Sequence, residues 1–194
     1  MVNKEKLVDG TKESILQLLA ETQYGEHNVL TYPDLDSFRE IYTHLAKTRI
    51  EDNNDLFLLL PHYETSKNVE QAFMELDIRA RDLIDSGSLE TVDSHHAFFD
   101  PAQTFLQFVE ATAKEAVRKR KSGVIVMADM GSFFHRQAVE RLIEHECKIP
   151  ASIDEARFAI LCCYHAGDFG KLSQKQEVKL CENHYRNLLV RNLE

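Results

Sequence analysis

The chain has 194 residues, of which 43% are hydrophobic and 28% charged, a composition typical of one soluble domain with a sizeable core. Its formal net charge of −9 argues against direct binding of nucleic acid, because contact with phosphates requires clustered Lys and Arg. The longest apolar runs, residues 56–60 and 158–164, are too short to cross a membrane, and residues 1–19 show no signal-peptide pattern. We therefore expect a cytoplasmic protein without membrane contact.

Residues 1–25 are predicted to form an N-terminal extension with a short amphipathic helix. Four apolar residues repeat there at helical spacing: Ile15, Leu16, Leu18 and Leu19. An apolar stripe outside the main domain is often covered by a partner or by a second copy of the chain, so this stripe predicts a homodimer. Residues 26–194 are expected to form a single domain.

Strands and helices alternate through that domain. Apolar or alternating runs predict strands over residues 27–32, 55–62, 88–93, 123–128, 157–164 and 187–190. Helices are predicted from Asp34 or Asp36, from a cap at Ser66, from the capping-box sequence Asp100-Pro101-Ala102-Gln103, over residues 135–147, and from Ser173. Continuous apolar strands that alternate with helices indicate a three-layer α/β fold, with a mostly parallel sheet between two layers of helices.

The four cysteines, Cys147, Cys162, Cys163 and Cys181, lack CxxC spacing and are expected to be free thiols. Three Cys/His groups could each supply two metal ligands: His145 with Cys147, Cys162-Cys163 with His165, and Cys181 with His184. Cys162 and Cys163 fall inside a predicted core strand, where a free cysteine acts as a small apolar residue. No compact zinc module matches this spacing, so no metal or other cofactor is predicted, although the pattern leaves open whether these groups bind a metal.

Six short motifs occur in a fixed order along the chain. They are the His-led strand from His27 to Tyr32, the run LFLLLPHYET with Tyr63 and Thr65, the turn Ser86-Gly87-Ser88-Leu89, the helix start Phe99-Asp100-Pro101, the strand end Ala128-Asp129-Met130, and the strand ILCCY followed by a helix that ends at His184. With these motifs, residues 26–191 resemble the MEDS family, the methanogen/methylotroph DcmR-type sensory domain. The resemblance implies a non-catalytic sensory domain that is itself similar to KaiC- and RecA-like ATPases. The chain departs from the family pattern at Gly131-Ser132, where Trp is common nearby, and at Asp129, where Glu is usual.

The phosphate loop of such ATPases requires GxxxxGK[ST] between the first strand and its helix, so that backbone amides and a lysine reach the phosphates. Residues 31–37, with the sequence TYPDLDS, contain no glycine and no lysine, and their two aspartates repel phosphate. Asp129 occupies the position of a Walker B carboxylate, but without the loop we expect it to hold no Mg²⁺–nucleotide. The sequence therefore predicts a RecA/KaiC-like fold without a phosphate loop and without ATPase activity.

Aromatic and ionisable residues directly follow the predicted apolar strands: Tyr32, His62, Tyr63, Asp129 and His165. The carboxyl ends of parallel strands are where ligands bind in such sheets, although these residues could also be ordinary strand ends. Together with His27, which begins the family's first strand, they are the predicted ligand-binding residues. The polar cluster of Asp93, His95, His96 and Asp100 is expected to be a loop, and no catalytic residue is predicted.

The sequence thus favours a sensory domain that binds a small, partly apolar metabolite and acts through a regulatory partner protein. Two alternatives remain open. One is an enzyme that keeps residual nucleotide or hydrolytic chemistry at the strand ends. The other is an adaptor that binds only protein, through the N-terminal helix or the acidic surface.

Overall fold

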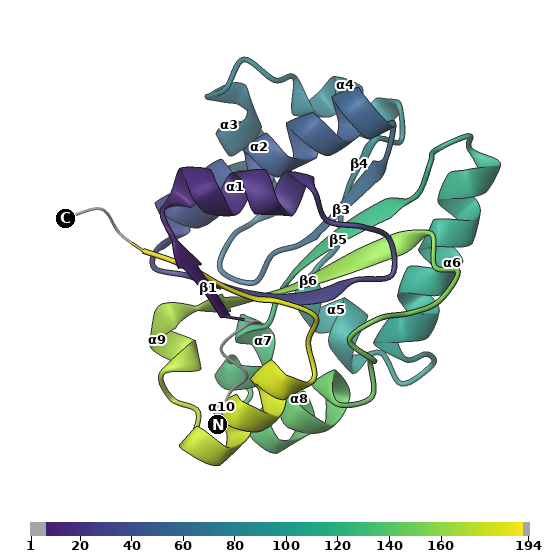
Figure 1. The fold of residues 1–194 in the computed structure, drawn as a ribbon. Coiled ribbons are helices and arrows are strands. Elements are labelled where there is room, and N and C mark those ends of the chain that lie inside the picture. The colour runs from purple at the N-terminus through teal and green to yellow at the C-terminus, as the bar shows by residue number, and fades with distance from the viewer. Residues whose placement is uncertain (1–6, 192–194) are drawn as a thin grey trace.

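A computed structural model describes residues 7–191 and shows one seven-stranded sheet in the order β1-β7-β2-β6-β5-β3-β4 (Figure 1). Each neighbouring pair of strands is parallel. The strands are β1 (Leu7–Gly10), β2 (His27–Tyr32), β3 (Leu56–Leu60), β4 (Leu89–Thr91), β5 (Val124–Asp129), β6 (Phe158–His165) and β7 (Asn187–Val190). The parallel sheet predicted from the alternating pattern is confirmed.

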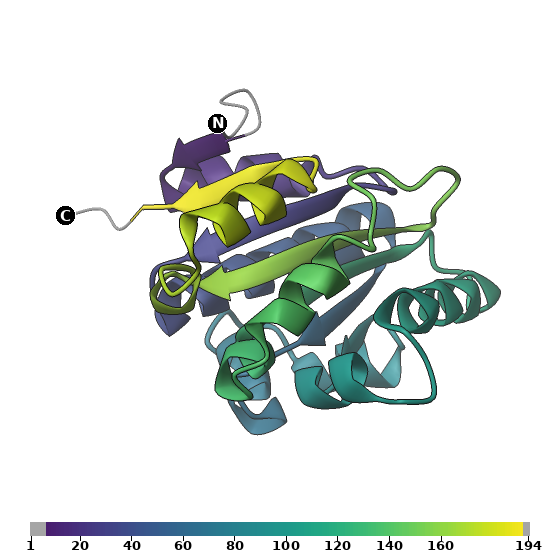
Figure 2. The ribbon, with the colours of Figure 1, turned by 90° about the horizontal axis from the view of Figure 1, so that it is seen from below.

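Helices cover both faces of this sheet, which gives the three layers seen in Figures 1 and 2. One face carries α1 (Lys12–Ala20), α2 (Leu35–Asn53), α3 (Ser66–Met74) and α4 (Ala80–Asp85). The other carries α5 (Ser94–Phe99), α6 (Phe105–Arg118), α7 (Gly131–His135), α8 (Val139–Glu146) and α10 (Gln174–Glu182). The short helix α9 (Ala166–Phe169) follows the carboxyl end of β6. Among residues 7–191, no helix has the length and hydropathy that a membrane crossing requires.

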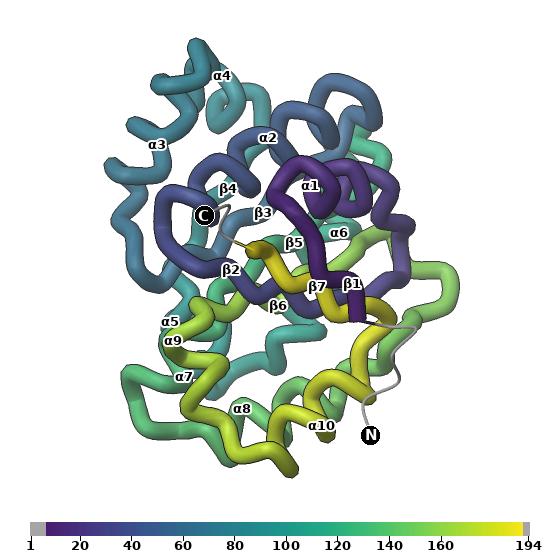
Figure 3. Tube along the Cα trace, turned by 60° about the vertical axis from the view of Figure 1, so that its left-hand side comes forward, coloured from purple at the N-terminus to yellow at the C-terminus, as the bar shows by residue number. Residues whose placement is uncertain are grey.

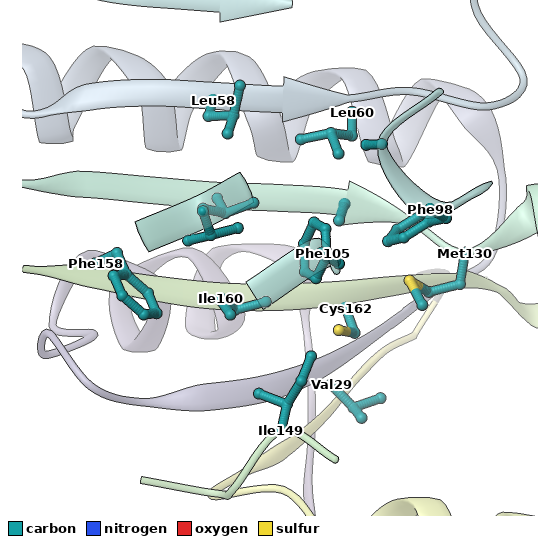
Figure 4. Close-up of a cluster of buried hydrophobic side chains, with 14 of the residues drawn as sticks. Val29, Leu58, Leu60, Phe98, Phe105, Met130, Ile149, Phe158, Ile160 and Cys162 are labelled. Atoms are coloured by element: carbon teal, nitrogen blue, oxygen red, sulfur yellow. The ribbon is translucent and has the colours of Figure 1, made fainter. Parts of the chain in front are cut away.

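Strand β3 shows why its sequence is an unbroken apolar run. Leu58 and Leu60 point into the core beneath α5 and α6, while Phe57 and Leu59 point into the core beneath α2 and α3. Figure 4 shows the first of these clusters, with Leu58 and Leu60 on the same side of the sheet as Phe98. Because both faces of the central strands are covered, a polar residue on either face would be buried.

The N-terminal stripe lies inside this core rather than on the surface. Ile15 and Leu19 are 0% exposed and pack with residues of α2, while Leu16 and Leu18 are partly buried against the same cluster. Strand β1 pairs with β7 at the edge of the sheet, and Figure 3 shows α1 beside α2. The stripe that predicted a homodimer is therefore covered by the chain itself, because β1 brings α1 back onto the sheet.

Two predicted helix starts are wrong by a few residues. Residues 94–99 form the helix α5, capped by Asp93, where a loop was expected, and Asp100 ends this helix instead of opening the next. The long helix α6 begins at the capping box of Thr104 and Gln107, a second [S/T]-x-x-[E/Q] pattern that lies next to the apolar run. Similarly, α3 is capped by the side chain of Thr65 and not by that of Ser66.

The helix predicted over residues 135–147 begins later in the structure, where α8 starts at Val139. The preceding helix α7 ends at His135, and Gln137 lies between the two helices in the left-handed region at φ 55°. The amide of Ala138 donates to the carbonyl of Phe133, a turn that ends α7 and redirects the chain. The break allows α8 to take its own direction, and Glu146 lies buried at the end of this helix.

Candidate functional site

Five of the six predicted ligand-binding residues meet at the carboxyl edge of the sheet. Tyr32, Asp129 and His165 end the strands β2, β5 and β6, and His62 and Tyr63 follow β3. Their rings contact one another, with centroids 5.6 Å apart for Tyr32 and His165 and 6.0 Å for Tyr63 and His165. The structure therefore places these side chains in one group, because the carboxyl ends of neighbouring parallel strands lie at the same edge of the sheet.

His27 does not belong to this group. It begins β2, whereas Tyr32 ends it, so the two lie ~16 Å apart along the strand. His27 is also 0% exposed and points into the core on the α8 side of the sheet. The structure therefore places His27 apart from the other five predicted ligand-binding residues, because it begins β2 rather than ending it.

Tyr32 and Asp129 form the buried floor of the group. Both are 0% exposed, and the Tyr32 hydroxyl donates to Oδ2 of Asp129 at 3.0 Å. The amide of Gly131 donates to the other carboxylate oxygen, Oδ1, at 2.9 Å. Burial raises the pKa of Asp129 to about 7, although these two hydrogen bonds lower it. Asp129 thus changes charge near neutral pH in a place that solvent does not reach.

The exposed part of the group lines a pocket of ≈ 390 Å³ beside α9, which we call the strand-end pocket. Its lining consists of Leu35, Tyr63, His165, Gly167, Asp168 and Lys171. Tyr63 is 43% exposed and its hydroxyl donates to Asp168, whose Oδ1 also lies 2.6 Å from Nζ of Lys171. The pocket therefore combines an aromatic wall with a paired carboxylate and ammonium.

Four lining residues of the strand-end pocket were not predicted from the sequence: Leu35, Gly167, Asp168 and Lys171. Leu35 looks like a core residue of α2, and Asp168 and Lys171 fall in a segment without helical periodicity. For Asp168 and Lys171, the signal in the sequence is their position, because residues 166–171 directly follow the strand that ends at His165. Three larger hollows, of ≈ 720, ≈ 650 and ≈ 500 Å³, are lined in part by residues of α6 and include none of the predicted site residues.

Close packing beside the pocket depends on Gly131, the first residue of α7. A Cβ atom at this position would lie 2.5 Å from Cδ2 of His62 and 2.8 Å from Cε2 of Tyr63. Both rings therefore rest against a backbone that lacks a side chain. Burial and the neighbouring His135 lower the pKa of His62, so this imidazole favours its neutral form.

The first turn of α2 shows how the chain replaces a phosphate loop. The side chain of Asp34 accepts a hydrogen bond from the Ser37 amide at 2.7 Å, which caps the helix with a carboxylate. Asp36 adds a second negative charge to this turn. Arg39 is bound to Asp36 and to Glu64 at 2.8 and 2.6 Å. The amide of Ser37 and the guanidinium of Arg39 are thus already paired with carboxylates.

The cluster predicted as a polar loop has a structural role. The side chain of Asp93 accepts from the amides of His95 and His96 and caps α5. Nε2 of His95 lies 2.7 Å from the guanidinium of Arg136, which also covers the ring of Phe99. These contacts hold α5 against the end of α7.

The parallel sheet, its two helical layers and the strand-end pocket define a RecA/KaiC-like fold whose phosphate-binding turn is replaced by a carboxylate cap. The chain belongs to the MEDS family, the methanogen/methylotroph, DcmR sensory domain, whose family model matches residues 26–184. Its fold is similar to the solved structure of a KaiC-like protein from the hyperthermophilic archaeon Pyrococcus horikoshii OT3, with a TM-score of 0.54 and 12% identity over 81% of this chain and 68% of that chain. None of the curated proteins compared with the chain matches it. The resemblance and the fold class predicted from the sequence are confirmed, and the family assigns the chain a sensory role in signal transduction.

Proposed function

We propose that this sensory domain binds a small, partly apolar metabolite in the strand-end pocket and passes the bound state to a regulatory protein partner. The observation that carries the proposal is the lining of the pocket. Leu35 and Tyr63 offer apolar contact, while the paired Asp168 and Lys171 offer one polar anchor of each charge.

The charge of the pocket favours a neutral or zwitterionic ligand. Asp168 is 4% exposed and receives hydrogen bonds from Tyr63 and Lys171, so its negative charge is offset within the chain. A phosphate group in the pocket would face the carboxylate of Asp168. We therefore propose a non-catalytic role without nucleotide chemistry.

A ligand in this pocket would touch two elements at once. Leu35 begins α2, whereas Asp168 lies in α9, which is joined to the sheet through β6. Ligand contacts that favour one position of α9 would change the surface beside the pocket, and a partner could recognise this change.

A thermal-shift screen of small uncharged and zwitterionic metabolites tests the proposal, since a ligand that binds the folded chain raises its melting temperature. For any hit, calorimetry compares Tyr63→Ala with Tyr185→Ala, because the two tyrosines are 43% and 42% exposed and only the first lines the pocket. We expect Tyr63→Ala to weaken binding about tenfold, or roughly 1.4 kcal/mol. Equal affinities of the two variants would show that the pocket is not the binding site.

A further inference from the structure

Four side chains with metal-binding atoms meet inside the core, on the face of the sheet covered by α8 and α10. They are His27 from β2, Glu146 from the end of α8, Cys162 from β6 and His184, which follows α10; we call them the buried His/Cys/Glu cluster. All four are 0% exposed. Figure 4 shows the sulfur of Cys162 on this face, close to Val29 and Ile149.

Four of the six distances between the ligand atoms of the cluster are close to those between the ligands of a tetrahedral ion. Oε2 of Glu146 lies 3.2 Å from Nε2 of His27, 3.3 Å from Nε2 of His184 and 3.4 Å from Sγ of Cys162. Sγ of Cys162 is 3.3 Å from Nε2 of His27, and all four atoms lie within 4.8 Å of one another. Zinc bonds of about 2.0–2.1 Å to N or O and about 2.3 Å to S require ligand atoms roughly 3.3–3.6 Å apart.

The hydrogen bond on the far side of His184 supports a bound cation. Nδ1 of His184 lies 2.7 Å from the carbonyl oxygen of Leu180, and a carbonyl oxygen only accepts, so Nδ1 carries the proton. Nε2 of the same ring faces Oε2 of Glu146 at 3.3 Å, where either a proton or a metal cation can lie between the two atoms. A backbone carbonyl is a common outer partner of a metal-bound histidine.

Glu146 is held in a matching way. The hydroxyl of Tyr164 donates to Oε1 of Glu146, which leaves Oε2 facing the other three ligand atoms. Asn183 donates to the carbonyl oxygen of Glu146 at 2.6 Å and to that of Ile149 at 2.8 Å. These contacts within the chain hold the end of α8 against the end of α10 and do not depend on a bound ion.

Charge balance selects the class of ion. A divalent cation, the carboxylate of Glu146, the thiolate of Cys162 and two neutral imidazoles sum to zero, which reduces the cost of burial. Binding releases the thiol proton of Cys162 to solvent, and the sulfur then donates its electron pair to the metal. One sulfur and two nitrogens favour Zn²⁺ over Mg²⁺ or Ca²⁺, which prefer oxygen ligands.

We propose that the buried His/Cys/Glu cluster binds one Zn²⁺ ion in a closed, structural site that ties α8 and α10 to strands β2 and β6. The chain supplies all four ligands and the site is fully buried, so no position faces a substrate. The site lies on the opposite face of the sheet from the floor of the strand-end pocket, because Tyr32 and Asp129 point toward α2.

The neighbours of these residues in sequence show why spacing did not reveal the site. Of the three Cys/His groups, only Cys162 and His184 belong to the cluster, while Glu146 lies between His145 and Cys147 and is itself the ligand. His27 is 119 residues before Glu146 (146 − 27), and the two meet because β2 pairs with β6 and α8 packs on this face of the sheet.

Cobalt titration of the chelator-treated, reduced full-length chain tests the proposal. We expect one Co²⁺ per chain, with the visible bands of a tetrahedral ion and a thiolate-to-cobalt charge-transfer band, and displacement by Zn²⁺. Cys162→Ala should abolish the charge-transfer band. Cys163→Ala is the matched control, because Cys163 is equally buried but points to the opposite face of the sheet.

A second variant keeps the test valid if Cys162→Ala does not fold. Replacing Cys147, Cys163 and Cys181 together by alanine leaves Cys162 as the single thiol and all four proposed ligands intact. This variant should keep both the stoichiometry and the charge-transfer band. The proposal is overturned if the folded wild-type chain binds no ion at one per chain, or binds one without a thiolate band, as surface histidines would.

Discussion

The phenol of Tyr32 donates a 3.0 Å hydrogen bond to the carboxylate of Asp129, and solvent reaches neither side chain. The bond spans the strand β6 that lies between β2 and β5 in the sheet. The carboxylate at the end of β5 therefore joins the ends of two strands. Since burial raises the pKa of Asp129 to about 7, this joint changes charge in the physiological range.

Asp129→Asn should change how stability depends on pH. The pKa of Asp129 is about 7 in the folded chain and near 3.8 when unfolded, so the folded state binds more protons between these values. Stability from this group is fully present below about pH 4 and is lost as pH rises toward 7, by up to about 1.4 kcal/mol per pH unit. The asparagine variant should lack this loss of stability. In urea unfolding, its free energy of unfolding should therefore rise relative to that of the wild type as the pH increases from about 4 to 7.

Tyr32→Phe provides the control for this prediction. The hydrogen bond from Tyr32 lowers the pKa of Asp129, so its removal should raise the pKa further and extend the pH window of lost stability upward. If wild type and Asp129→Asn keep a constant difference in unfolding free energy from pH 4 to pH 8, Asp129 is ionised throughout and the explanation by burial is wrong.

Thr104→Ala should destabilise the chain by about 1 kcal/mol, because Thr104 caps α6 in a reciprocal capping box with Gln107. Asp100→Ala should cost less, since its side chain accepts only the amide of Ala102 in a turn. Denaturant unfolding of the two variants compares the observed start of α6 with the one predicted at Asp100. A larger loss of stability for Asp100→Ala than for Thr104→Ala would indicate that Asp100, and not Thr104, caps α6.

The order of strands and helices was accessible from the sequence because local signals determine it. The β3 segment is apolar on both faces, and Ser173 and Gln176 form the capping box expected for α10. Where two local signals compete, as at Asp100 and Thr104, the sequence alone does not rank them. The strand β1 was missed because its four residues pair only at the edge of the sheet, with a half-exposed pattern.

The strand-end group could be predicted because a parallel sheet brings its carboxyl ends to one edge. Burial could not be predicted, and it separates the exposed Tyr63 from the enclosed Tyr32 and Asp129. The buried His/Cys/Glu cluster shows the same limit, since His27 and Glu146 meet only through tertiary packing. Spacing in sequence detects sites built on one element, whereas these four residues come from four different parts of the chain.

Arg49→Met should destabilise the chain by about 3 kcal/mol without affecting the strand-end pocket. Arg49 is 4% exposed, pairs with the buried Asp55 at 2.9 Å and donates to the carbonyl oxygen of Thr22 at 3.0 Å. Removing the cation leaves a buried carboxylate with the hydroxyl of Tyr24 as its remaining side-chain donor. The double variant Arg49→Met with Asp55→Asn should cost less than the sum of the two single changes. Additive costs in urea unfolding would show that the two charges do not interact.

Mg²⁺–ATP should bind no more tightly than millimolar, because the first turn of α2 offers carboxylates where a phosphate loop offers amides and a lysine. The Ser37 amide already donates its hydrogen bond to the carboxylate of Asp34, and Arg39 forms ion pairs with Asp36 and Glu64. Calorimetry with Mg²⁺–ATP measures the affinity directly, and phosphate release measures turnover. Asp36→Asn serves as a sensitive control: it removes one repelling charge and frees part of Arg39, so any weak phosphate contact should strengthen. Micromolar affinity or steady hydrolysis by the wild-type chain would contradict the sensory role and support an enzyme that retains nucleotide chemistry at its strand ends.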